Sequence, residues 1–178
     1  MASMYHTIYL DERVALAPSD VNEALKLDDG ITKKLLSHLQ TKYERRCNVD
    51  GYVRAGSVEI LQKSMGLGEN GRFTGNWVWD CKFKCQVLYP TAGNEVEAIV
   101  LKVNKMGVYA ILFDDLIKNK DEAMIRILLP RDIHLGNTEF DDINEGDRVI
   151  VTLERSKFQT NDLFIVSVGR FVRKLEVE

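Results

Sequence analysis

The sequence predicts a small α+β domain followed by an all-β domain that closes into a five-stranded barrel. In the first half, a helical pattern lies between strand patterns, which is the order expected of an α+β domain. The second half shows strand patterns and turns, with one short helical turn. Its first hairpin slips out of alternation once, and such a slip indicates a bulge that lets a strand coil round a small barrel. We place the two domains at residues 1–90 and 91–178.

Length and composition are those of an intracellular globular protein. The chain has 178 residues, which is enough for one large domain or two small ones. No apolar run approaches the length of a membrane span, and the first residues lack the features of a secretory signal, so we expect no membrane partner and no export. Three cysteines, an odd number, argue against a disulfide framework and for a reducing compartment.

The charge distribution limits the kind of nucleic acid that the protein can hold. The net charge is −3, and the residues after Gly93 carry 12 basic and 16 acidic side chains, a balance of −4. Proteins that hold duplex DNA alone usually present a basic face. We therefore expect any nucleic-acid contact to be local and modest, or to be made within a larger assembly.

The elements of the first half follow from periodicity and capping signals. A strand is predicted first, over Tyr5 to Leu16, and Pro18 and Ser19 then open a short helix with Ser19 as its N-cap. The main helix starts near Gly30, because apolar side chains follow at helical spacing; they are Ile31, Leu35, Leu36, Leu39 and Tyr43. The remaining predicted strands, after a turn at Asp50-Gly51, are Tyr52 to Leu61 and Trp77 to Tyr89.

A glycine-rich loop, Met65 to Asn76, separates those last two strands. It contains Gly66, Gly68 and Gly71 in the GxGxxG pattern. A dinucleotide site with this motif needs a helix directly after it, whereas Arg72 to Asp80 has a strand pattern. We interpret the loop as a surface docking element, with Arg72 and Phe73 as a charged and an apolar anchor. An enzyme that binds a nucleotide with this loop is the rival interpretation.

The second half is predicted from its alternation. After the break at Pro90 and Gly93, apolar Val96, Ala98 and Val100 alternate with acidic residues, as in a half-buried strand. Val103 is one residue out of phase, which locates the bulge. The other predicted elements are strands at Val108 to Leu112, Ala123 to Leu129, Val149 to Leu153 and Phe164 to Val168, a helical turn at Pro130 to His134, and an exposed charged loop at Asp114 to Glu122.

Residues with catalytic or metal-binding chemistry are few and scattered. Cys81 and Cys85 share a face of a predicted strand, so buried thiols are a better interpretation than a zinc site. His6, His38 and His134 have no Ser, Asp or Cys nearby at a suggestive spacing, although triads assemble in space and the sequence leaves a catalytic histidine open. We predict no metal, no cofactor and no catalysis.

The predicted barrel carries a set of residues suited to unpaired nucleic acid. An aromatic side chain on a strand can stack on an unpaired base, and nearby cations can follow the phosphates. The candidates are Lys102, Lys105, Tyr109, Arg126, Arg155 and Lys157. An equally good interpretation places Tyr109 in the core and gives the cations only a solubilising role.

The whole pattern resembles the larger stalk subunit of multisubunit DNA-directed RNA polymerases, the family that includes the seventh-largest subunit of RNA polymerase II and its archaeal counterpart. The best segment runs from Cys81 to Tyr109. It contains the family's lysine–aromatic–lysine strand (Lys82-Phe83-Lys84), then a proline and a glycine, and then the first barrel hairpin at the same spacing. Gly51-Tyr52-Val53 fits a further family strand, and residues 66–75 fall where the family has its glycine-rich tip loop.

The resemblance implies a fold and three partners. The fold is an α+β N-terminal tip domain at residues 1–90 and an OB-fold barrel at residues 91–178. The tip loop docks on the RNA polymerase core subunits, a smaller stalk subunit packs along the domain junction, and the barrel meets nascent single-stranded RNA during transcription. The chain is then a non-catalytic subunit, acting in the nucleus of a cellular host or in the cytoplasm or virion of a viral system.

Three barrel positions depart from the family pattern. Pro130 stands where the family has a histidine after its third barrel strand, and Lys157 and Asn161 stand where RNA-binding members often have Asp and Arg. A free-standing RNA-binding module, of the exosome-cap or translation-factor type, is the alternative interpretation. Binding of RNA by the isolated protein would favour that alternative.

Overall fold

The computed structural model describes residues 4–71, 73–113 and 123–175 and shows a mostly β protein with few helices. The chain divides into two compact units. Of the described residues, the sheet unit contains Tyr5–Arg45 and Val53–Val87, and the barrel unit contains Met4, Arg46–Tyr52 and those from Leu88 to Leu175. The predicted docking residue Arg72 and the predicted loop at 114–122 lie outside the described residues.

The strands outside the barrel form one sheet in the order β1-β6-β3-β2, and β4 and β5 also pair with β6. Their bounds are Tyr5–Leu16 for β1, Cys47–Asn48 for β2, Gly51–Val53 for β3, Glu59–Lys63 for β4, Leu67–Gly68 for β5 and Trp77–Leu88 for β6. The prediction of one continuous strand over Tyr52 to Leu61 is therefore wrong, because β3 ends at Val53 and β4 begins at Glu59. A turn interrupts it, in which the Ser57 hydroxyl donates a hydrogen bond to the Arg54 carbonyl oxygen at 2.6 Å.

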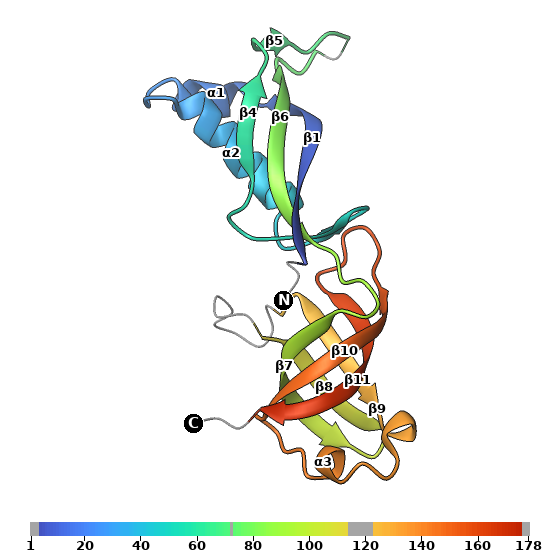
Figure 1. Cartoon of the computed structure of the whole chain (residues 1–178). Coiled ribbons are helices and arrows are strands. Elements are labelled where there is room, and N and C mark those ends of the chain that lie inside the picture. The colour runs from blue at the N-terminus through green and yellow to red at the C-terminus, as the bar shows by residue number, and fades with distance from the viewer. Residues whose placement is uncertain (1–3, 72, 114–122, 176–178) are drawn as a thin grey trace. The chain divides into compact units, whose positions relative to one another are not determined.

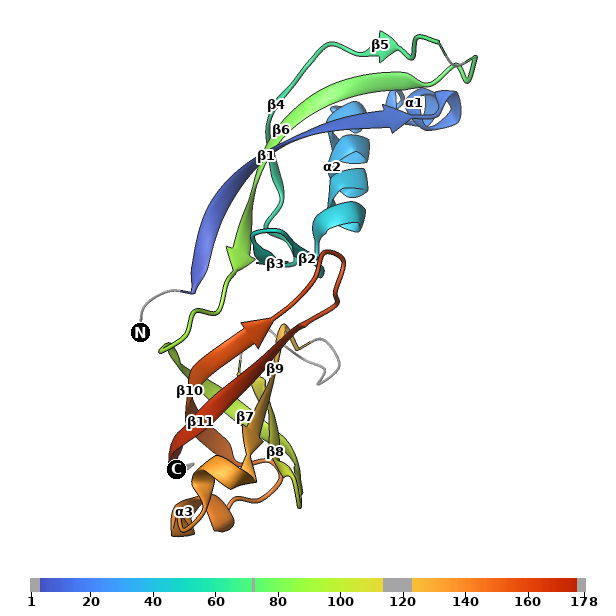
Figure 2. The ribbon, with the colours of Figure 1, turned by 90° about the vertical axis from the view of Figure 1, so that its right-hand side faces the viewer.

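Two helices, α1 (Pro18–Ala24) and α2 (Gly30–Tyr43), lie on one face of this sheet (Figure 2). The predicted N-cap of α1 is wrong: Ala17 occupies that position in an extended conformation, and Pro18 is the first helical residue. Proline suits that position because the first turn of a helix leaves its N–H groups without intrahelical partners, so the missing donor costs nothing there.

The core of the sheet unit lies between α2 and the sheet. Leu35 and Leu39 of α2 are fully buried, and Tyr43 packs its ring at a tilt against Phe83 of β6, with centroids 5.2 Å apart. Cys81 and Cys85 lie in the same buried cluster, as predicted from their shared strand face. The helical spacing of the α2 side chains thus gives the helix one face that packs on the sheet.

Five strands of the barrel unit close into a barrel in the order β10-β11-β9-β8-β7 (Figure 1). Their bounds are Glu95–Asn104 for β7, Gly107–Leu112 for β8, Ile125–Pro130 for β9, Arg148–Lys157 for β10 and Ile165–Leu175 for β11. β9 and β11 run parallel, and the other neighbours are antiparallel. The predicted bulge is confirmed, because the β7–β8 register shifts between Val100 and Lys102.

The lower end of the barrel in Figure 1 holds two short helical segments, η2 (Arg131–His134) and α3 (Thr138–Asp141). The first was predicted; α3 was missed, because four residues are too few for a periodic pattern. The His134 ring stacks on Phe140 of α3 with centroids 4.2 Å apart and accepts a hydrogen bond at Nε2 from the Phe171 N–H at 2.8 Å. His134 is therefore a buried structural residue that joins α3 and η2 to β11.

Among residues 4–71, 73–113 and 123–175, no helix combines the length and the apolar character that a membrane-spanning helix requires.

Candidate functional site

The strand register of the barrel gathers the predicted nucleic-acid-binding residues. Tyr109 on β8 pairs with Lys102 on β7 and with Leu128 on β9. Leu128 pairs with Val168 on β11, which pairs with Arg155 on β10. Directly paired residues point to the same side of a sheet. Lys102, Tyr109 and Arg155 are therefore members of one row that crosses five strands.

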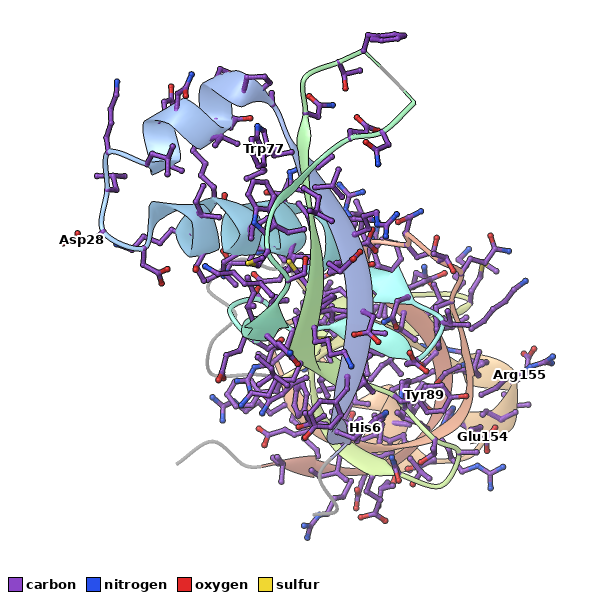
Figure 3. The ribbon with its side chains drawn as sticks, turned by 90° about the horizontal axis from the view of Figure 1, so that it is seen from above. His6, Asp28, Trp77, Tyr89, Glu154 and Arg155 are labelled. Atoms are coloured by element: carbon purple, nitrogen blue, oxygen red, sulfur yellow. The ribbon has the colours of Figure 1, made fainter. Side chains whose placement is uncertain are left out.

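A second row runs beside the first. Arg126 on β9 pairs with Ile111 on β8 and with Val166 on β11, and Val166 pairs with Lys157 on β10. We call these two rows the barrel face. Five of the six predicted residues belong to it, and Arg155 extends outward from the barrel ribbon (Figure 3). Lys105 does not belong to it, because it lies in the turn that joins β7 to β8.

A largely apolar groove of about 440 Å³ lies in the barrel face. The residues that shape it include Leu101, Tyr109, Arg126, Leu128, Phe164 and Val166. Tyr109 is 38% exposed, so it contributes to the wall of the groove and not to the core. The two interpretations of Tyr109 that the sequence left open are thereby separated, because only the closed barrel defines which side of β8 is outside.

Arg126 and Phe164 form a pair inside this groove. The guanidinium carbon of Arg126 lies 3.8 Å from the centre of the Phe164 ring, which is the separation of a cation–π stack. Phe164 was not among the predicted site residues. It had the pattern of a core strand residue, and its half-exposed position depends on how the chain enters β11.

In the part of the barrel that the structure describes, the cations of the barrel face have no carboxylate partners. Among the described residues, no carboxylate oxygen lies within 4.0 Å of the side-chain nitrogens of Lys102, Arg126, Arg155 or Lys157. Other barrel cations are paired: Arg148 with Glu97 at 3.3 Å, Arg170 with Glu154 at 3.0 Å and Lys174 with Asp147 at 2.6 Å. The described carboxylates of this acidic half thus leave the positive charge of the barrel face without an ion pair.

The glycine-rich loop has a different character. Its pairs Leu67–Val78 and Gly68–Trp77 join β5 to β6, and the next element after the GxGxxG pattern is the strand β6. Four large apolar side chains in and beside the loop are exposed, and we call them the loop patch: Met65, Leu67, Phe73 and Trp77. Phe73, the predicted apolar anchor, is fully exposed. The patch resembles a protein-docking surface more closely than a phosphate cradle.

The three glycines of the loop have different roles. Gly71 has a φ of 81°, in the left-handed region that favours glycine. A Cβ at Gly66 would lie 2.7 Å from the Trp79 ring, so this glycine is needed for space. Neither reason for a glycine applies to Gly68, because a Cβ there would meet open space and its φ is not in the left-handed region. Of these three glycines, only Gly71 has a backbone conformation that other residues rarely adopt.

The cysteines and Glu12 lie outside these two surfaces. Cys47, Cys81 and Cys85 are buried, and burial raises the pKa of the Cys47 thiol to about 12. Glu12 on β1 accepts hydrogen bonds from the Lys42 ammonium at 2.8 Å and from the Tyr43 hydroxyl, which ties β1 to α2. In the part of the chain that the structure describes, no three His, Cys, Asp or Glu side chains gather in a way that would hold a metal.

No model of a known protein family matches the sequence, and no curated protein matches it at a significant level. An assignment of function therefore depends on the two surfaces, the barrel face and the loop patch.

Proposed function

We propose that this chain is a non-catalytic stalk subunit of a multisubunit DNA-directed RNA polymerase. In this proposal the sheet unit is the α+β tip domain, and the barrel is an OB-fold, an architecture that often holds unpaired nucleic acid on its surface. The core subunits of the polymerase and a smaller stalk subunit are the protein partners. The barrel face is the observation that carries the proposal, because it suits nascent RNA that leaves such an enzyme.

The chemistry of the barrel face fits a single-stranded nucleic acid. Unpaired bases offer π-faces to Tyr109 and to the Arg126–Phe164 pair, while phosphates can approach Lys102 and Lys157. Duplex DNA would meet too little positive charge on a chain with a net charge of −3. A polymerase that delivers its transcript to this face needs only the modest affinity that a few cations supply.

The loop patch supports docking on a larger assembly. Several large apolar side chains exposed within one short segment are a feature of protein interaction sites. Phe73 and Trp77 are the aromatic members, and aromatic side chains commonly carry much of the energy of an interface. We assign them as the anchors that enter a groove of the polymerase core.

Docking is tested by capture of core subunits from cells that express a tagged chain. Deletion of Gly66–Gly71, or the double substitution Phe73→Ser and Trp77→Ala, is expected to abolish capture. Leu27→Ser is the matched control, because Leu27 is an exposed apolar residue of the same unit outside the loop patch. Core subunits that still bind to the loop variants would refute docking by this patch.

RNA contact is tested by crosslinking a nascent transcript to the assembled enzyme. The variant Tyr109→Ala with Lys102→Ala is expected to lower the crosslinking yield several-fold, since it removes one stacking ring and one cation. Arg170→Ala is expected to leave the yield unchanged, because Arg170 is held by Glu154 outside the two rows of the barrel face. Equal yields from all three proteins would remove the RNA contact.

The barrel face taken alone also fits a free-standing RNA-binding module, of the exosome-cap or translation-factor type. That function predicts tight binding of RNA by the isolated chain and no dependence on the loop patch. Measurement of both properties with the purified protein separates the two functions.

A further inference from the structure

We propose that Arg126, held against the ring of Phe164, is the surface on which one unpaired base stacks. The barrel face would then hold a nucleotide through a three-layer stack of phenyl ring, guanidinium and base. This inference rests on the proposed contact with single-stranded nucleic acid and specifies the residue that makes it.

The first argument is that one face of the Phe164 ring is already covered by Arg126. Its ring lines the groove, but the guanidinium of Arg126 lies 3.8 Å from the ring centre and covers that face. A base that enters the groove on this side meets the guanidinium before it meets the ring. Phe164 therefore acts as a support that holds a planar cation in place, and Tyr109 forms another part of the groove wall.

The second argument is the chemistry of the guanidinium. It is planar, delocalised and weakly hydrated, so it stacks on aromatic surfaces, and RNA-binding proteins stack bases on such planes. Its N–H donors lie in the plane of the group and remain available to phosphate or base oxygens at its edge. A lysine ammonium at this position would retain the charge but would supply no plane.

The third argument comes from the second arginine–phenylalanine stack in the barrel. The guanidinium carbon of Arg148 lies 4.1 Å from the centre of the Phe113 ring, yet Arg148 also pairs with Glu97 at 3.3 Å. Glu97 neutralises that cation. Arg126 has a similar stack and, among the described residues, no carboxylate, so its charge is available to an anionic ligand.

The test uses the full-length protein and a short single-stranded RNA that carries the fluorescent adenine analogue aminopurine. The wild type is expected to quench the probe through stacking. Arg126→Lys is expected to weaken binding about 10-fold, which corresponds to the loss of one base stack. It is also expected to abolish the quenching. The slope of log affinity against log salt concentration is expected to stay the same, because the number of charges is conserved.

Two further variants separate stacking from charge and from folding. Phe164→Leu changes no charge but removes the support, so it is expected to lower affinity and quenching as Arg126→Lys does. Arg148→Lys makes the same substitution in the neutralised stack and is expected to bind as the wild type does. Urea unfolding of all three variants shows whether an affinity change reflects loss of the fold.

The outcomes distinguish this inference from the proposed function. If Arg126→Lys binds and quenches as the wild type does, the three-layer stack is refuted, while contact with RNA stands. If the wild type fails to bind the probe even at low salt, both the stack and the RNA contact are refuted. If Phe164→Leu retains full affinity and quenching, the supporting role of Phe164 is wrong.

Discussion

The backbone of Cys47 is hydrogen-bonded to the loop that joins β10 to β11, with the Cys47 N–H donating to the Asp162 carbonyl oxygen at 2.8 Å. In return, the Asn161 N–H donates to the Cys47 carbonyl oxygen, also at 2.8 Å. Residues 46–52 thus belong to the barrel unit although they come early in the chain. This loop leads into Phe164, which lines the groove of the barrel face.

Phe158 should contribute to the stability of that loop. Its ring meets Tyr89 edge to face, with centroids 5.9 Å apart. We expect Phe158→Ala to lower the free energy of unfolding by about 1–3 kcal/mol, through lost burial and the lost aromatic contact. Urea unfolding measures the change. Phe73→Ala is the matched control, since Phe73 is fully exposed and its removal should change stability by less than about 0.5 kcal/mol.

Glu12 should make stability depend on pH in the acid range. Burial alone would raise the pKa of its carboxyl, but the hydrogen bonds from Lys42 and Tyr43 outweigh burial and lower the pKa below the usual 4.5. A lowered folded-state pKa stabilises the protein above the unfolded-state value, and that stability is lost as the pH falls through the folded-state value. We expect Glu12→Gln to destabilise the protein by about 1–2 kcal/mol at pH 7.

The difference between wild type and Glu12→Gln should shrink when urea unfolding is repeated at an acidic pH below the lowered pKa of Glu12, because the wild-type carboxylate is then protonated. A difference that stays constant between the two pH values would show that Glu12 acts through packing and not through its charge.

His134 should be important for the end of the barrel. It is 5% exposed, and its loss would leave the Phe171 N–H without its acceptor and remove the stack on Phe140. We expect His134→Ala to cost about 2–4 kcal/mol in thermal or urea unfolding. His134→Phe should restore part of this loss, because it keeps a ring but no acceptor. The exposed His38 offers a comparison, and we expect His38→Ala to cost less than about 0.5 kcal/mol.

Gly66 and Gly68 should respond differently to the same substitution. A methyl group at Gly66 would collide with the Trp79 ring, so Gly66→Ala should destabilise the protein by about 1–3 kcal/mol and alter tryptophan fluorescence. Gly68→Ala meets open space and should be nearly neutral. Equal effects of the two substitutions would mean that the loop does not pack on Trp79.

Elements that are determined by residues close together in the sequence were predictable. The apolar spacing of α2 and the phase slip before Val103 are local patterns, and both correspond to observed features. The interruption of Tyr52 to Leu61, the Ala17 cap and the short helix α3 were not found. Each of these depends on a few hydrogen bonds or on one tertiary contact, which periodicity does not report.

From the chain alone one could tell which residues alternate, where the first barrel strand slips, and which cations and aromatic residues the barrel strands carry. Only the tertiary structure decided that Lys102, Tyr109, Arg126, Arg155 and Lys157 share a face, that Lys105 does not, and that Phe164 joins them. The physical reason is that strand register and closure of the barrel set which side of each strand is outside. Those are properties of pairs of strands far apart in the chain, whereas alternation is a property of one strand.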